Sequence, residues 1–345
     1  MSRVKALVRR VRAEGFTPRE FTTIAVAALL LNSVIVVSGG VVRLTGSGLG
    51  CVDWPNCNGA KVIDVSTGHS AIEQINRLFT FIVALGVVLA AVAAWFRRPR
   101  RRDLLRYALI LVIGVPAQAL LGAVVIWTEL HPAAVQWHFL LSMVLVASAV
   151  MLIIRSGEPD EGRRVAAVVP RVRNRVRLLV VWTAITVVLG TVVTNTGPHA
   201  GDKESKHFFG RWAVPKGDVV PRSVVNGDAL KWVSRIHGVV VWVTVAIAFS
   251  LLWTLRRLRN DRRVLDAPLT AWIVIAVAQG AVGYTQYAAG LPVGLVAMHL
   301  AGATALVGIT TWMWAVTSRI TETAGDMVER VTRQRRTRPA TPSAP

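Results

Sequence analysis

Eight apolar segments dominate this sequence, and each is long enough to cross about 30 Å of bilayer hydrocarbon as a helix. They lie at about 21–42, 74–96, 105–127, 135–154, 178–195, 231–254, 269–288 and 294–317. Of the 345 residues, 53% are hydrophobic and 17% are charged, which is too little charge to cover the surface of a soluble chain of this length. The sequence therefore predicts an all-α polytopic membrane protein with eight transmembrane helices.

The net charge of +21 indicates topology and not a nucleic-acid partner. Thirty of the 40 Lys and Arg residues lie in five segments, which are 1–20, 97–106, 155–177, 256–263 and 319–345. Cytoplasmic loops of membrane proteins are enriched in Lys and Arg. We therefore expect a multi-pass protein of a bacterial inner membrane with both termini in the cytoplasm. The lipid bilayer is its expected partner, and no nucleic acid is expected to bind.

An internal repeat relates the two halves of the chain. Three matches share an offset of 161 positions, namely residues 117–122 with 278–283, His138 with His299, and Asn76 with His237. The first helices also match, at another offset, with Gly39-Gly40-Val41-Val42 corresponding to Gly190-Thr191-Val192-Val193. A duplicated unit of four helices keeps both copies in the same orientation. The repeat predicts two tandem, pseudo-symmetric four-helix bundles.

The repeat and the charges together predict five parts. These are a basic cytoplasmic N-terminus (1–20), an N-terminal four-helix half (21–154), a cytoplasmic linker (155–177), a C-terminal four-helix half (178–318) and a disordered cytoplasmic tail (319–345). The first outer loop, at about 43–73, holds Cys51 and Cys57. Two cysteines this close can form a disulfide in an oxidising compartment. Whether such a bridge staples the loop or takes part in redox chemistry stays open.

Three histidines lie inside apolar helices, where a polar side chain needs a reason. His138, His237 and His299 each follow the outer end of a helix by a few residues, so they share one depth in the membrane. His237 and His299 lie on helices that can stand diagonally opposite in a bundle and bind one metal from two sides. Imidazole is a common axial ligand of haem. The alternative is that these histidines only bond neighbouring helices, but a repeated pair at matched depth favours ligation.

A charged motif, Glu73-Gln74-Ile75-Asn76-Arg77, opens the second helix. Ser70 and Glu73 have the spacing of a capping box, and Glu73 and Arg77 have that of a local ion pair. From spacing alone, a structural role for Glu73 is favoured. Arg77 and Arg235 lie just inside the outer interface, where guanidinium groups either bind haem propionates or extend to lipid headgroups. No role is assigned to the other four histidines, His69, His131, His199 and His207.

In these residues the chain resembles the haem A synthase family of cytochrome oxidase assembly, over about residues 20–318. The most specific stretch runs from Gly39 to Gly59 and reads GGVVRLTGSGLGCVDWPNCNG. The resemblance implies oxidation of the C8 methyl group of haem O to a formyl group, by two hydroxylations and loss of water, which gives haem A for cytochrome c oxidase. It also implies a substrate haem in the N-terminal half and a haem b in the C-terminal half. The implied partners are haem O, the haem O synthase (a protohaem farnesyltransferase) and other cytochrome oxidase assembly factors.

The family's functional residues carry over at most positions. His237 and His299 match the haem b ligands, His138 matches a ligand of the N-terminal site, Glu73 matches the essential carboxylate, and Cys51 and Cys57 match the outer-loop pair. The chain departs from the family at Asn76, because the motif is usually Glu-x-x-His-Arg. A neutral Asn is a poor iron ligand, so we expect haem O to bind through His138, with Asn76 beside an empty position or a water.

The competing hypothesis is a non-catalytic di-haem b electron-transfer subunit or a haem chaperone. The two halves differ in a way that favours an enzyme, because Glu73 and the cysteines occur only in the N-terminal half. At the offset of 161, Ser234 replaces the carboxylate. A transporter is a weaker alternative, since the repeat is parallel and no helix is broken in mid-membrane.

Overall fold

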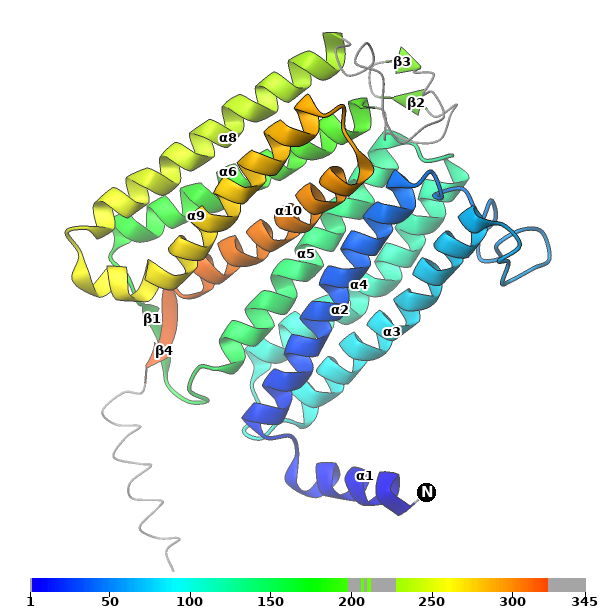
Figure 1. Ribbon diagram of the computed structural model, residues 1–345. Helices are drawn as coiled ribbons and strands as arrows, with labels where there is room; N and C mark the ends of the chain where they lie inside the picture. The colour runs from blue at the N-terminus through cyan, green and yellow to red at the C-terminus, as the bar shows by residue number, and fades with distance from the viewer. Residues whose placement is uncertain (1, 198–205, 208–209, 212–227, 322–345) are drawn as a thin grey trace, which may run out of the picture.

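The computed structural model describes residues 2–197, 206–207, 210–211 and 228–321, and its long helices lie side by side in roughly one direction (Figure 1). Eight of the described helices are long and apolar enough to span a membrane. They are α2 (Pro18–Leu44), α3 (Gly68–Phe96), α4 (Arg102–Trp127), α5 (Pro132–Ser156), α6 (Pro170–Thr196), α8 (Asp228–Leu255), α9 (Arg259–Ala288) and α10 (Val293–Ala315). The prediction of an all-α membrane protein with eight transmembrane helices is confirmed.

The remaining elements are short and lie at the two ends of these helices (Figure 1). They are α1 (Ser2–Glu14), β1 (Arg163–Ala166), β2 (Lys206–His207), β3 (Gly210–Arg211) and β4 (Ser318–Thr321). Strand β1 pairs antiparallel with β4, with Arg163 opposite Thr321, and β2 pairs with β3. The tail predicted to be disordered from residue 319 therefore begins with an ordered strand, because the linker offers it a backbone partner. Residues 322–345 lie outside the described residues.

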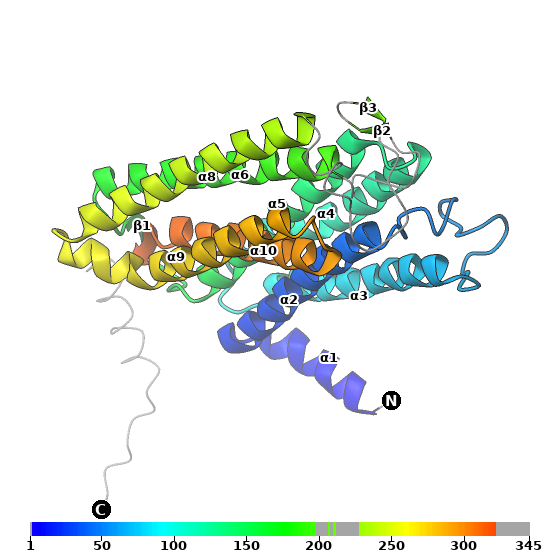
Figure 2. The same ribbon diagram turned by 45° about the horizontal axis from the view of Figure 1, so that its top comes forward.

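The two bundles are built from consecutive helices. Helices α2 to α5 pack together as one half, and α6, α8, α9 and α10 form the other, with α2, α5 and α10 in mutual contact between them (Figure 2). A buried amide, Asn195, joins the halves. Its Oδ1 accepts a hydrogen bond of 2.5 Å from Arg43 Nη2, and its Nδ2 donates one of 3.1 Å to the carbonyl of Pro132.

The internal repeat extends to the backbone of the turns. Residues 128–131 join α4 to α5, and residues 289–292 join α9 to α10. Leu130 and Leu291, which are 161 positions apart, both adopt the left-handed conformation, with φ of 60° and 62°. The N–H of Leu130 donates to the carbonyl of Val125 at 2.8 Å, and that of Leu291 donates to Gln286 at 2.7 Å. Such bonds close the C-termini of helices, and their recurrence shows that the two helical hairpins have the same geometry.

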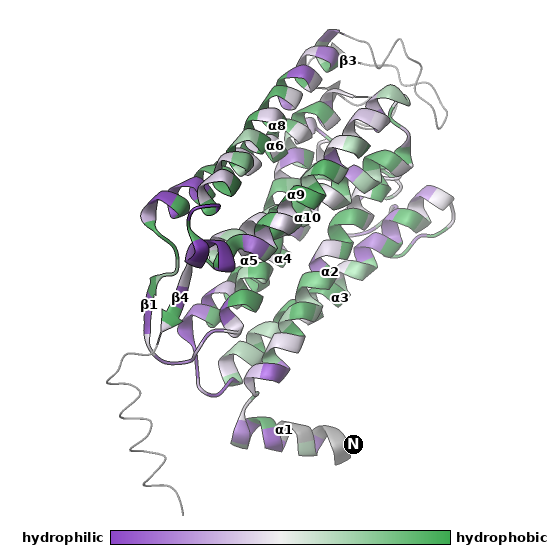
Figure 3. Ribbon diagram, turned by 60° about the vertical axis from the view of Figure 1, so that its left-hand side comes forward, coloured by the Kyte–Doolittle hydropathy of each residue, from purple (hydrophilic) through white to green (hydrophobic). Residues whose placement is uncertain are grey.

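The tightly packed core of each half lies toward the end that carries α1, β1 and β4. In the first half the buried cluster extends along α4 only to Val115 and begins along α5 at Leu145. In the second half it extends along α6 to Leu179 and begins along α8 at Ala248. The other end, called the disulfide end here because it carries the loop with Cys51 and Cys57, contributes no buried residue to these two clusters. Hydrophobic residues predominate along the length of the helices, and hydrophilic residues are most frequent near their ends and on α1 (Figure 3).

We predict that Gly114→Ala destabilises the first bundle. A methyl group at Gly114 of α4 would lie 2.2 Å from Cδ2 of Leu145, which is itself buried in α5. Overpacking of this kind costs about 1–3 kcal/mol. The thermal unfolding temperature of the purified protein in detergent should fall. Gly280→Ala is the matched control, because nothing lies within 4 Å of its added methyl group, and its unfolding temperature should stay level or rise. Equal temperatures for the two variants would contradict this account of the α4–α5 contact.

Candidate functional site

Four polar positions lie at one depth near the disulfide end. Asn76 is in α3, His138 in α5, His237 in α8 and His299 in α10. Each lies within about the first three turns of a helix that begins at this end. The sequence repeat predicted this common depth, and the described helix bounds agree with it.

Each of the four positions faces a glycine on a helix that comes earlier in the chain, namely α2, α4, α6 and α9. A methyl group added at Gly39 would lie 4.0 Å from Nδ2 of Asn76, one at Gly122 would lie 3.6 Å from Cε1 of His138, and ones at Gly190 and Gly283 would lie 3.3 Å from Cε1 of His237 and His299. Each side chain therefore rests on bare helix backbone, and a larger residue at any of these glycines would press on it. The sequence repeat contained these glycines, but their contact with the polar positions emerges only from the structure.

The histidines have the surroundings of haem ligands. His237 and His299 lie close enough for charge on one imidazole to act on the other. The Nδ1 atoms of all three are buried, and none makes a hydrogen bond of normal geometry among the described residues. The backbone of Thr186 approaches His237, and that of Gln279 approaches His299. Ligating histidines usually turn one ring nitrogen toward a backbone carbonyl and the other toward the metal.

The donor set also fits a haem better than a bare metal ion. In the part of the chain that the structure describes, no three His, Cys, Asp or Glu side chains gather closely enough to hold a metal ion. A haem iron takes most of its ligands from the porphyrin and needs only one or two from the protein. A histidine pair in one half and a single histidine in the other therefore supply enough protein ligands for one haem in each half.

Asn76 is oriented by a neighbour on α2. The Ser38 hydroxyl donates a hydrogen bond of 2.7 Å to Oδ1 of Asn76, and the Asn76 amide nitrogen lies on the side of Gly39. The amide is therefore held in place with its hydrogen-bond donor directed away from Ser38. A neutral amide in this setting can bond a water more readily than it can bind iron.

Glu73 lies one turn before Asn76 and is 6% exposed. Its Oε2 accepts a hydrogen bond of 2.9 Å from the backbone N–H of Cys51, and its Oε1 accepts bonds of 3.0 and 2.7 Å from Nε and Nη2 of Arg77. The expected ion pair with Arg77 is confirmed. The capping box proposed for Ser70 and Glu73 is wrong, because α3 begins earlier than its apolar run and is capped by Thr67, with Ser70 as the partner. Glu73 therefore does not cap α3, and its carboxylate points toward the disulfide loop.

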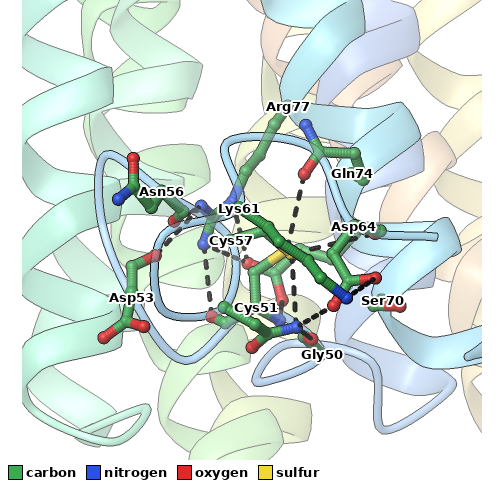
Figure 4. The surroundings of a disulfide bond; sticks show 12 residues. Gly50, Cys51, Asp53, Asn56, Cys57, Lys61, Asp64, Ser70, Gln74 and Arg77 are labelled. Carbon is green, nitrogen blue, oxygen red and sulfur yellow. Dashed lines mark hydrogen bonds and ion pairs between the residues drawn. A yellow bond between two sulfur atoms is a disulfide. The ribbon is translucent and has the colours of Figure 1, made fainter. Parts of the chain in front are cut away.

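Arg77 clamps the disulfide loop onto α3 (Figure 4). Its Nη1 donates to the carbonyls of Asp53 and Asn56 at 3.1 and 3.0 Å, and its Nη2 donates to the carbonyl of Cys51 at 3.3 Å. The guanidinium is therefore engaged by its own chain instead of extending to headgroups. Arg235, for which the sequence predicted the same role as for Arg77, is exposed on α8. Its guanidinium carbon lies 5.4 Å from the centroid of the Trp232 ring.

The loop itself is closed by a disulfide between Cys51 and Cys57, both fully buried. The sulfur of Cys51 lies 3.7 Å from Oε1 of Gln74 (Figure 4). Gly50 permits this approach, since a Cβ there would lie 2.4 Å from the carbonyl oxygen of His69. The predicted pairing is confirmed, and Cys51, one of the two disulfide residues, is also the residue whose backbone N–H donates to Glu73.

Other contacts brace the loop, and the sequence did not reveal them. The Asn58 amide and the Ser66 hydroxyl and N–H lower the pKa of Asp64 to about 2, so this carboxylate stays ionised and holds the loop's second half. His69 Nδ1 lies 2.9 Å from the Ser47 hydroxyl.

Of the other histidines set aside earlier, His131 caps α5 by accepting a hydrogen bond from the N–H of Ala133 at 3.3 Å. His199 and the side chain of His207 lie outside the described residues.

Comparison with known proteins agrees with this arrangement. Residues 22–74 and 63–311 match the COX15-CtaA family, described as cytochrome oxidase assembly protein. A protein of Listeria welshimeri named Heme A synthase is 26% identical over 302 residues, which covers 86% of this chain and 94% of the relative. Proteins of the same name from Staphylococcus saprophyticus and Staphylococcus epidermidis are 24% and 23% identical, over 75% and 89% of this chain and 83% and 98% of the relatives. Since the match spans all eight membrane helices and the disulfide loop, the chain belongs to the cytochrome oxidase assembly protein family.

Proposed function

We propose that this chain is a haem A synthase, a membrane oxidoreductase that oxidises the C8 methyl group of haem O to a formyl group and so supplies haem A to cytochrome c oxidase. The observation that carries the proposal is an asymmetry between two otherwise matched halves. Both halves present polar positions over glycines, but among the described residues only the first half places a buried carboxylate, Glu73, one turn away from such a position. In the second half Ser234 stands there. An electron-transfer subunit or a haem chaperone has no need for that carboxylate.

In the C-terminal half, His237 and His299 are proposed as the residues that would hold the iron of haem b. Their mutual interaction, buried Nδ1 atoms and glycine contacts support this assignment. When bound there, haem b supplies one-electron transfer. Arg235, exposed two residues before His237, is proposed to pair with a propionate, which guanidinium binds bidentately.

His299→Ala should abolish the low-spin absorption spectrum of the C-terminal haem in the purified protein, because one axial imidazole is lost. His237→Ala should do the same. His138→Ala is the matched control, as it removes a buried histidine of the other half, and it should leave this low-spin spectrum in place. A normal low-spin spectrum in both of the first two variants would exclude the assignment.

In the N-terminal half, haem O is proposed to bind through His138 with Asn76 on the opposite side. Glu73 is proposed to orient water or to stabilise positive charge that develops at the oxidised carbon. Burial strengthens such an interaction, since it lowers the local dielectric. The bonds from Cys51 and Arg77 hold both carboxylate oxygens, so the group is oriented before the reaction begins.

Glu73→Gln should stop haem A formation in cells that co-express a haem O synthase, because it removes the charge while keeping the side-chain size. Extracted pigments should show haem O or its alcohol intermediate in place of haem A. Glu129→Gln, an identical change at an exposed residue of the same end, should give the native yield. If the native chain itself made no haem A under these conditions, the electron-transfer or chaperone alternative would replace the proposal. A normal yield from Glu73→Gln would remove Glu73 from the catalytic role.

Asn76→His should convert the N-terminal haem from high-spin to low-spin. A single imidazole with a weak or absent sixth ligand gives high-spin iron, whereas a second imidazole at this position completes a bis-histidine site. Electron paramagnetic resonance of the oxidised protein measures both states. A native N-terminal haem that is already low-spin would mean that another residue supplies the second ligand.

The proposed orientation has the disulfide end outside and both termini in the cytoplasm. Two independent observations support it. The basic segments 1–20, 97–106, 155–177 and 256–263 lie at the end of the helices opposite the loop (Figure 1), and the disulfide requires an oxidising compartment. The proposed source of the substrate is a haem O synthase, the protohaem farnesyltransferase reaction that must precede this one. Cytochrome oxidase assembly factors are the proposed recipients of the product.

A further inference from the structure

A long apolar groove of about 1120 Å³ lies along α2 and is walled by α3, α5 and α10. Residues of α2 from Leu29 to Val42 line it, which corresponds to a length of roughly 20 Å along the helix. At the disulfide end it reaches Asn76, and toward the other end it reaches Trp312. The groove is thus elongated along the helices, and its volume is slightly above the range of about 300–1,000 Å³ that is typical of ligand pockets.

The walls of the groove suit a hydrocarbon chain. Its few hydroxyl groups away from the disulfide end are already bonded to their own helices, with Ser33 donating to the carbonyl of Leu29 at 2.9 Å and Thr304 to that of Leu300 at 3.0 Å. Ser38 and Asn76, bonded to each other, form its polar end. The other side chains that line the groove are apolar, apart from the indole N–H of Trp312 at its far end.

One residue belongs to both the groove and the candidate site. Asn76 lines the groove and also stands at the polar position of α3 over Gly39. A molecule with a ring at that position and a long apolar chain attached to it would therefore fill both spaces at once. Haem O has this form, because it is protohaem carrying a farnesyl-derived chain.

We propose that the groove along α2 binds the farnesyl-derived chain of haem O and so selects this substrate over protohaem, which has the same iron and ring system but lacks the chain. The inference rests on the proposed function. Lipid tails solvate an apolar chain nearly as well as an apolar protein surface does, so a hydrophobic effect does not favour binding of the chain to the groove. The preference for haem O over protohaem must therefore come from close van der Waals packing of the chain against the groove walls. The alternative occupant is an acyl chain of a membrane lipid, which would give no preference between the two haems.

The test is a titration of the N-terminal site with haem O and with protohaem, followed by absorbance, in protein that retains its C-terminal haem. The native protein should bind haem O at least about tenfold more tightly, equivalent to about 1.4 kcal/mol. Ala305→Trp places a large ring in the groove from α10, at a residue that is exposed and lines it. It should lose the preference by weakening haem O while leaving protohaem unchanged.

Two further variants make the test specific. Ala281→Trp makes the same change at an exposed residue of α9 outside the groove and should keep the native preference. Val34→Trp fills the groove from α2, where Val34 is 53% exposed, and should repeat the effect of Ala305→Trp even if that variant fails to fold.

Equal affinity of the native protein for both haems, or an unchanged preference in the groove variants, would assign the groove to lipid and overturn the inference. Because the readout is binding, it stays separate from turnover. A native protein that prefers haem O but makes no haem A would overturn the proposed function alone.

Discussion

Contact between a glycine and a polar side chain on the next helix is the interaction on which both halves of this protein depend. It occurs four times, at Asn76, His138, His237 and His299. Without a Cβ, each glycine lets the side chain lie directly on helix backbone, which sets its depth and direction. The packed apolar cores lie at the opposite end of the helices. On the proposed function, packing and haem binding fall at different ends of the same helices, so the end with the four polar positions does not have to be filled by side chains.

On this repeated frame the disulfide loop makes one half different from the other. Arg77 holds the loop by three carbonyl groups and holds Glu73 by one carboxylate oxygen, while Cys51 holds the second oxygen. A carboxylate placed at low dielectric needs such partners, because an uncompensated buried charge is costly. The disulfide keeps the Cys51 N–H in position to donate to Glu73, so the loop contributes to the surroundings of this carboxylate. It completes the surroundings of Glu73, whose counterpart in the other half is Ser234.

Much of the fold was predictable because hydrocarbon permits few choices. Each apolar run became a helix, and three matches at an offset of 161 were enough to predict the two bundles. The errors lie where local signals compete. Ser70 and Glu73 have capping-box spacing, but α3 starts earlier, at the cap of Thr67, because polar residues extend it beyond its apolar run. Strand β4 was missed since its partner, β1, is more than a hundred residues away, and no local pattern reports such a pairing.

By itself, the sequence determined the eight helices, their repeat, the depth of the histidines and the identity of the cysteine pair, because hydropathy and spacing are properties of the chain alone. Only the tertiary structure decided what those residues contact. It turned Glu73 from a cap toward Cys51, engaged Arg77 with the loop, set each polar position over its glycine, and opened the groove along α2 that ends at Asn76. Each of these features depends on contacts between residues that are far apart in the sequence. Local hydropathy and spacing do not predict such contacts.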